Sequence, residues 1–147
     1  MDEKELLEAL RKDILKACDS IAEEMKEIES KVIKEVVYEA YQPQTYRRRE
    51  DDRGLSDTKN MHEEIMPTSD GVHIEVTNYT TGNENYYDAQ GYTAGLIQDI
   101  IIEGEGYGYG LDSVIGPRDF ITAAQEQIDN SDEVDDVLEK ELRRLGW

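Results

Sequence analysis

Apolar residues recur every three or four positions along the N-terminal part of the chain. Glutamate and lysine fill the positions between them, and the apolar set is Leu7, Leu10, Ile14, Cys18, Ile21, Met25, Ile28, Val32 and Val36. This spacing predicts one long amphipathic helix over residues 1–41, with Pro43 as its stop. Such a helix would be roughly 50 Å long. Because one small globule cannot cover that length, part of the apolar stripe should meet another helix of this chain or of a neighbouring subunit.

A second pattern, with a period of two, lies near the middle of the chain. Residues 61–66 and 72–80 read as two strands, and Asp70-Gly71 supplies the residue types of a tight turn between them. The second strand places two chemically different sets on its faces: Val72, Ile74 and Val76 against His73, Glu75 and Thr77. Residues 61–80 are therefore expected to form an antiparallel hairpin with one face toward the core.

Helical spacing returns in the C-terminal part of the chain. Residues 93–103 fit a short helix between a Thr93 cap and Gly104, although Ile100–Ile102 alone would suit a strand. Residues 119–145 carry the stripes of two further helices, namely Phe120, Ala123, Ala124, Gln127 and Ile128, then Val134, Val137, Leu138, Leu142 and Leu145. The predicted fold is a single α+β domain with a long N-terminal helix, a small antiparallel sheet, a short middle helix and a C-terminal helix pair.

The segments between these elements are rich in tyrosine, arginine and glycine. Residues 44–60 read as an irregular polar loop, and residues 104–118 as a loop in which glycine and tyrosine alternate. Tyrosine and arginine are enriched at binding hot spots, since both combine contact area with a polar group. Residues 44–60 are expected to be a docking loop, and the candidate partner-binding residues are Tyr38, Tyr41, Tyr46, Arg47, Arg48, Arg49, Tyr107, Tyr109 and Arg118. The competing interpretation is that two or three tyrosines simply pack over the hairpin.

Net charge and composition narrow the class of protein. The 147 residues carry a formal net charge of −19, with a sequence pI of about 4.3. A free nucleic-acid binder normally has the opposite balance, and three adjacent arginines do not reverse it. The single cysteine, Cys18, excludes an internal disulfide and should be a buried thiol. The charged N-terminus and the lack of a long apolar run lead us to expect a soluble intracellular protein without membrane partners.

The motifs that usually carry chemistry fail at identifiable positions. The G-x-G-x-x-G pattern that begins at Gly104 has Tyr109 at its last position. His62 and His73 have no metal-ligand spacing, and the acidic run of residues 129–140 lacks the glycine and the glutamate of a calcium loop. No Ser or Cys has a recognisable base and orienting group. We therefore expect no catalytic, metal or cofactor site.

Three pieces of the sequence resemble small phage neck and tail-completion proteins of the HK97 gp10-like class. Residues 37–57 are similar to a segment V-Y-x-x-Y-x-P-x-x-Y-x-R-R followed by G-L-x-D. Ile102-Glu103 before Gly104 resembles a V-E-x-G step at a helix end. Pro117-Arg118-Asp119-Phe120 is similar to a P-R-P-F helix entry, with Asp119 in place of the second proline. Together the pieces and the elements between them span about residues 1–145.

The resemblance implies a structural role in the virion rather than catalysis. It implies assembly, as a homo-oligomeric ring, between the head connector or adaptor and the tail tube or terminator, with the host cytoplasm as the place of assembly. It also implies a small antiparallel sheet packed by helices and offers no catalytic residues. A ring of such acidic subunits could let DNA pass without sticking, and no sequence-specific nucleic-acid contact is expected.

Two other readings of the same sequence remain open. An acidic inhibitor that mimics DNA and blocks a host nuclease or restriction system fits the composition equally well, although the three arginines and the glycine-tyrosine loop do not help it. A coiled-coil oligomer built from residues 3–36 is also conceivable, but successive steps of four break a strict heptad.

Overall fold

The fold is taken from a computed structural model, which describes residues 1–39, 49–81, 101–102 and 118–147. Its elements are the helices α1 (Glu3–Ile33), α4 (Phe120–Asn130) and α5 (Glu133–Arg144), the π-helix η1 (Lys34–Tyr38), the 3-10 helix η2 (Thr58–Asn60), and the strands β1 (Met61–Pro67) and β2 (Val72–Asn78). Most of the predicted middle helix at 93–103, the glycine-tyrosine loop and the Pro43 stop lie outside the described residues. The α+β class is confirmed.

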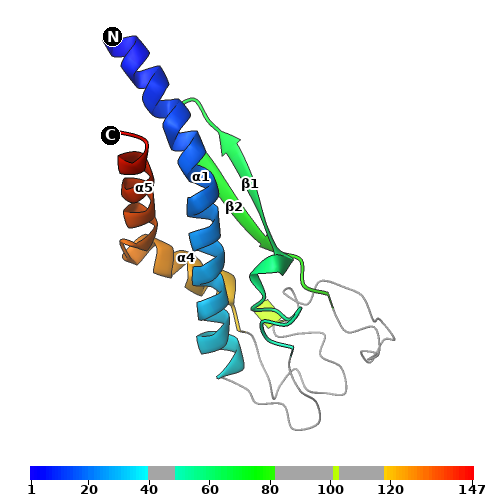
Figure 1. Ribbon diagram of the computed structural model, residues 1–147. Coiled ribbons are helices and arrows are strands. Elements are labelled where there is room, and N and C mark those ends of the chain that lie inside the picture. The colour runs from blue at the N-terminus through cyan, green and yellow to red at the C-terminus, as the bar shows by residue number, and fades with distance from the viewer. Residues whose placement is uncertain (40–48, 82–100, 103–117) are drawn as a thin grey trace, which may run out of the picture.

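Helix α1 is the axis on which the other elements pack. The hairpin lies along one side of it, while α5 runs antiparallel beside its N-terminal half and α4 crosses lower down (Figure 1). At its start, Asp2 and Glu5 form a reciprocal capping box: the Glu5 amide donates to Asp2 Oδ1 at 2.8 Å, and the Asp2 amide donates to Glu5 Oε2 at 3.0 Å. Helical structure is then continuous to Tyr38, in agreement with the long helix predicted from the apolar spacing.

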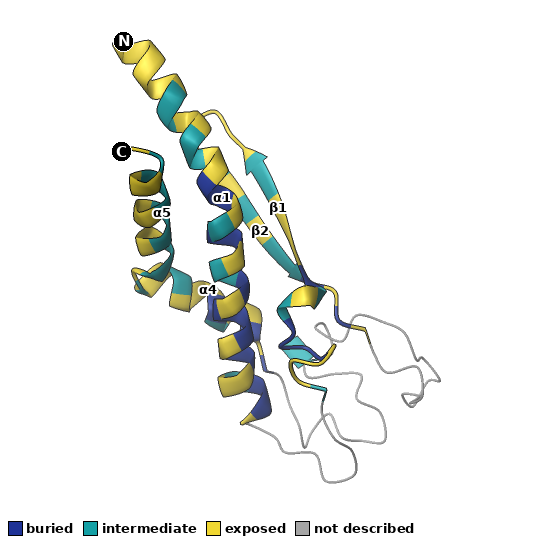
Figure 2. Ribbon diagram, in the orientation of Figure 1, coloured by how far each residue is buried: buried dark blue, intermediate teal, exposed yellow. Residues whose placement is uncertain are grey.

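Burial along α1 follows the predicted stripe only in its C-terminal two thirds. Cys18 is 1% exposed, as expected, and Ile21, Ile28 and Val32 are buried with it. By contrast, Leu7 is 49% exposed, and Figure 2 shows the first turns of α1 as largely exposed. Part of the stripe was expected to meet another helix, and within this chain α5 packs against α1. Its neighbour Trp147 donates from Nε1 to Asp13 Oδ2 at 2.8 Å, which joins the C-terminus to α1.

The hairpin has the predicted strands and a register that runs from Met61 opposite Asn78 to Pro67 opposite Val72. Met61 is fully buried, and in β2 the half-buried Val72, Ile74 and Val76 alternate with the exposed His73 and Glu75. An ion pair fixes the hairpin to α1, since Lys26 Nζ lies 2.5 Å from Glu63 Oε2 of β1 and 2.9 Å from Glu23.

The hydrophobic core forms where the C-terminal part of α1, η1, the hairpin and α4 meet. Its buried members are Ile28, Val32, Ile33, Val37, Tyr38, Leu55, Met61, Phe120 and Ala124. The described part of the expected irregular loop, residues 49–57, consists of turns and bends, and the sequence did not indicate that residues 54–57 are buried and that Leu55 closes one side of the core. Local sequence polarity misled here, because the polar side chains of this stretch are bonded internally.

One buried carboxyl lies between α1 and β2. Glu29 is 4% exposed, and its contact is a long hydrogen bond of 3.4 Å from Asn78 Nδ2 to Oε1. Burial penalises the charged form, and the bond from Asn78 offsets only part of that penalty, so the pKa of Glu29 is raised to about 7. The folded state therefore binds a proton that the unfolded chain releases above its ordinary pKa of 4.5.

Replacing Glu29 by glutamine should remove this pH dependence. In the wild type the stability contribution of Glu29 falls as the pH rises from about 4.5 to about 7, by up to about 3 kcal/mol. Glu29→Gln should therefore gain stability over the wild type across that window and keep the gain above it. Urea unfolding at several pH values measures the difference. The exposed Glu27→Gln is the matched control, and equal curves for Glu29→Gln and the wild type would contradict the account.

Candidate docking site at the C-terminal end of helix α1

The described residues that border the undescribed segments gather at the C-terminal end of α1. Arg49 donates from Nη2 to the Thr81 carbonyl at 2.7 Å, and the Arg118 amide donates to the Ile101 carbonyl at 2.8 Å. Arg118 also donates from Nη1 to the Val37 carbonyl at 2.9 Å. These bonds join the borders of segments 40–48, 82–100 and 103–117 to one another and to η1 (Figure 1). We call this end of the molecule the loop end.

A polar network, buried at Tyr38 and Ser56 and exposed at Lys34 and Asp51, holds residues 49–57 against α1 and η1. The Ser56 amide donates to Tyr38 Oη at 3.1 Å, and that hydroxyl donates in turn to Ser56 Oγ at 3.2 Å. Ser56 Oγ then donates to Asp51 Oδ1 at 2.6 Å, and Lys34 Nζ donates to Asp51 Oδ2 at 2.9 Å. The Ser56 and Lys34 bonds, in that order, lower the pKa of Asp51. A continuous chain of donors and acceptors thus joins Lys34, Asp51, Ser56 and Tyr38.

A second branch of the network fixes the same bend to the end of β2. Asn78, which is fully buried, donates from Nδ2 to the Leu55 carbonyl at 2.9 Å. Thr80 Oγ1 lies 2.6 Å from Asn78 Oδ1 and 3.3 Å from the Gly54 carbonyl. From α1, Ser30 donates to the Ser56 carbonyl at 2.7 Å. The bend is therefore bonded both to the helix and to the hairpin.

The backbone of the bend is tightly folded. Glu50 and Arg53 have φ angles of 50° and 62°, in the left-handed region that costs a non-glycine residue about 1 kcal/mol or more. At Gly54 a Cβ atom would lie 2.3 Å from the Glu50 carbonyl oxygen and 2.4 Å from its nitrogen. Glycine is required there because the two backbone stretches touch.

Of the predicted partner-binding residues, three are described, and all three have contacts within the chain. Tyr38 and Arg118 are buried, and Arg49 is half-buried against Thr81. Their contact with a partner stays a prediction, and the structure adds a role inside the fold that the sequence did not indicate. The remaining candidates lie outside the described residues: Tyr41, Tyr46, Arg47, Arg48, Tyr107 and Tyr109.

Sequence reasoning missed the residues that build the bend. Gly54, Ser56, Asn78 and Thr80 follow no apolar period, because the three polar residues act through several hydrogen bonds and Gly54 acts through a close backbone approach. The available signal was the G-L-x-D piece of the resemblance, since Leu55 enters the core and Asp57 caps η2 by accepting from the Lys59 amide at 3.0 Å. At the helix entry, Asp119 caps α4 by accepting from the Thr122 amide at 3.0 Å.

The chemical groups described at the loop end bear on catalysis and metal binding. Ser56 is 1% exposed and its hydroxyl donates to a carboxylate of lowered pKa, which is a poor base. Among the described residues, no cluster of three or more His, Cys, Asp or Glu side chains could hold a metal ion. No helix in the described part of the chain is long and apolar enough to cross a membrane. The absence of catalytic, metal and cofactor sites stays a prediction.

A family model matches almost the whole chain. The match is to YomN and covers residues 2–144, so the chain belongs to the YomN family. The name is phage-derived, of the SPbeta type, and it indicates a phage protein. No curated protein and no solved structure matches the chain. The family match does not bear on the HK97 gp10-like class.

Gly54→Ala should unfold the bend. Its Cβ would meet backbone atoms that cannot rotate away, and we expect a loss of about 2 kcal/mol or more in the free energy of unfolding. Gly71→Ala in the hairpin turn is the matched control, because its Cβ would come no closer than 3.9 Å to Thr68 Oγ1, and the change should stay within about 0.5 kcal/mol. Urea unfolding of both variants measures this. Equal losses would contradict the close approach.

Tyr38→Phe should test the hydroxyl at the centre of the network. The variant keeps the ring in the core but leaves the Ser56 amide without its acceptor, at a cost of about 1–2 kcal/mol. Tyr79→Phe, at a residue that is 50% exposed, should change stability by less than about 0.5 kcal/mol. Thermal unfolding of the two variants compares the effects, and an unchanged Tyr38→Phe protein would show that the network adds no stability.

Proposed function

We propose that this YomN-family chain is a structural virion protein that joins the head connector to the tail, and that the loop end contacts its neighbours in the particle. The family match supports a phage protein. The observation that carries the proposal is the gathering of the segment borders at one end by the bonds Arg49–Thr81, Arg118–Ile101 and Arg118–Val37. A joining protein needs contact residues held at a defined place on a rigid body.

The composition of the bordering segments supports contact with proteins. Seven of the nine tyrosines lie in segments 40–48, 82–100 and 103–117, and so do Arg47 and Arg48. Tyrosine gives a large contact area at low entropic cost, and arginine can bond to acidic or mixed surfaces through its planar fork of donors. The partners proposed are the head connector or adaptor on one side and the tail tube or terminator on the other, with the chain repeated as a ring.

One observation favours the alternative, an acidic inhibitor that mimics DNA. An open depression of about 360 Å³ beside α1 is lined by Asp19, Ser20, Glu23, Glu24, Glu27 and Glu63. Rows of carboxylates are what a mimic presents to a DNA-binding protein. Glu23 and Glu63 are, however, both paired with Lys26, which reduces the negative charge on this row. The joining role therefore accounts for more of the structure.

Particle composition tests the proposal. Phage particles purified on a density gradient should contain the chain at a few copies each, and Arg47→Glu with Arg48→Glu should lower its amount in particles by about 10-fold or more. Arg143→Glu with Arg144→Glu, on the exposed face of α5, makes the same charge change and should leave incorporation unchanged. Unjoined heads and tails should accumulate with Arg47→Glu and Arg48→Glu, and not with Arg143→Glu and Arg144→Glu.

A chain that stays out of particles and is recovered instead with a host nuclease would overturn the joining role and favour the inhibitor. Loss of incorporation in both double variants would show that net charge, rather than the loop end, governs assembly. Circular dichroism of each variant separates these results from unfolding.

A further inference from the structure

The end of the molecule opposite the loop end carries an exposed apolar face. Leu7 is 49% exposed, Leu6 is 47% exposed and Met1 is 87% exposed, although all three lie within or beside the first turns of α1. Neither α5 nor the hairpin extends over these turns (Figure 1). An open depression of about 510 Å³ lies here, lined by Asp2, Glu3, Lys4, Leu7, Glu8 and Arg11.

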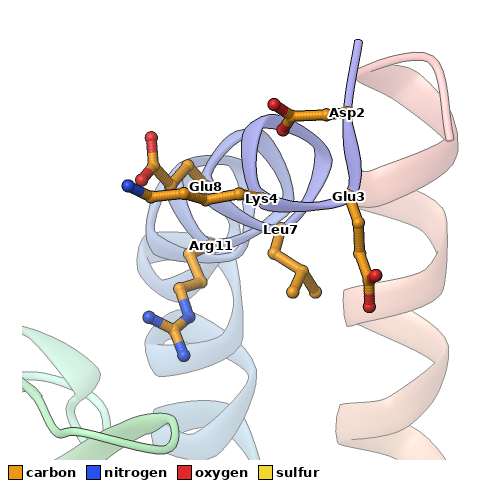
Figure 3. A pocket seen from close by; sticks show the side chains of 6 residues that line it. All are labelled: Asp2, Glu3, Lys4, Leu7, Glu8 and Arg11. Carbon is orange, nitrogen blue, oxygen red and sulfur yellow. The ribbon is translucent and has the colours of Figure 1, made fainter.

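One stripe of this surface has an ordered sequence of charges. Glu3, Leu7 and Arg11 follow one another at four-residue intervals, so they lie along the same side of α1. Figure 3 shows Leu7 between the side chains of Glu3 and Arg11. All three are exposed, and neither Glu3 nor Arg11 has an ion pair within the part of the chain that the structure describes. The stripe is thus negative, apolar and positive in order.

We propose that this stripe binds the same stripe of a second copy of the chain in antiparallel orientation. A two-fold axis through Leu7 places Leu7 against its own copy, Glu3 against the partner's Arg11, and Arg11 against the partner's Glu3. A parallel copy in register would set each charge against its like. The pattern is self-complementary only in the antiparallel arrangement, as an isologous contact requires.

The charge of the whole chain also favours this end for self-association. Residues 1–16 hold five acidic and four basic residues, so they carry −1 of the total −19 and leave −18 on the rest. Two copies repel one another over most of their surface, and this nearly neutral segment is where they can approach at least cost. The contact does not depend on the proposed joining role, because it uses the opposite end of the molecule.

The contact is small, since only the first turns of each helix can overlap before the hairpin and α5 intervene. Interfaces at the low end of the size range are weak, so the full-length chain should dimerise with a Kd of roughly 10–100 μM. Sedimentation equilibrium over a range of chain concentrations measures this Kd directly.

Charge exchange tests the arrangement. Glu3→Arg alone and Arg11→Glu alone each bring like charges together and should raise the Kd by at least about 10-fold. The double variant restores both pairs and should return to within about 3-fold of the wild type. An equimolar mixture of the two single variants should form heterodimers, because every charge again meets its opposite.

Lys12→Glu is the matched control. It makes the same charge change as Arg11→Glu on the next residue, which points away from the stripe, and it should change the Kd by less than about 3-fold. Leu7→Asp should abolish dimerisation, since two carboxylates would meet on the axis. Circular dichroism checks that each exposed substitution leaves the helix intact. A wild-type chain that is still monomeric at about 1 mM, or a dimer that none of these changes weakens, would overturn the proposal.

Discussion

The hydroxyl of Tyr38 is the group on which the loop end depends. It accepts from the Ser56 amide and donates to the Ser56 hydroxyl, so one buried side chain satisfies two polar groups of a bend that carries Leu55 into the core. A buried donor that is left without an acceptor costs about 1–3 kcal/mol. The bend contains several buried polar groups, so these hydrogen bonds are needed to keep it folded. The bonds from Asn78, Ser30 and Thr80 complete the same task from the hairpin and the helix.

Helix α1 separates two surfaces of different character. At its C-terminal end the core and the polar network join the borders of three tyrosine-bearing segments. At its N-terminal end the capping box stabilises the first turns of the helix, which neither α5 nor the hairpin covers. Leu7 is exposed there, between Glu3 and Arg11. In a chain of net charge −19, the joining contact that we propose would use the loop end, and the contact between copies that we propose would use the nearly neutral end. The two proposed contacts therefore use different surfaces of the chain.

The sequence was most informative where one physical period dominates. The three-to-four spacing predicted α1, and strict alternation predicted the hairpin with its inward Val72, Ile74 and Val76, because burial of an apolar face decides both elements. The polar composition around residues 54–57 did not indicate that these residues form a buried bend. Ser56 and Asn78 act through hydrogen bonds to segments far apart in sequence, and Gly54 acts through a close approach to the Glu50 backbone, and no apolar period records either kind of contact. For the site, the sequence named Tyr38 and Arg118 but did not indicate that both are buried.

Hydrogen exchange of the isolated full-length chain tests most directly whether the loop end is built before any partner binds. The amide of Ser56, which donates to buried Tyr38, should exchange as slowly as the amides of buried α1 residues, at a rate set by global unfolding. The amide of Glu50, in the exposed part of the same bend, should exchange quickly. A Ser56 amide that exchanges as fast as that of Glu50 while α1 stays protected would contradict a preformed scaffold.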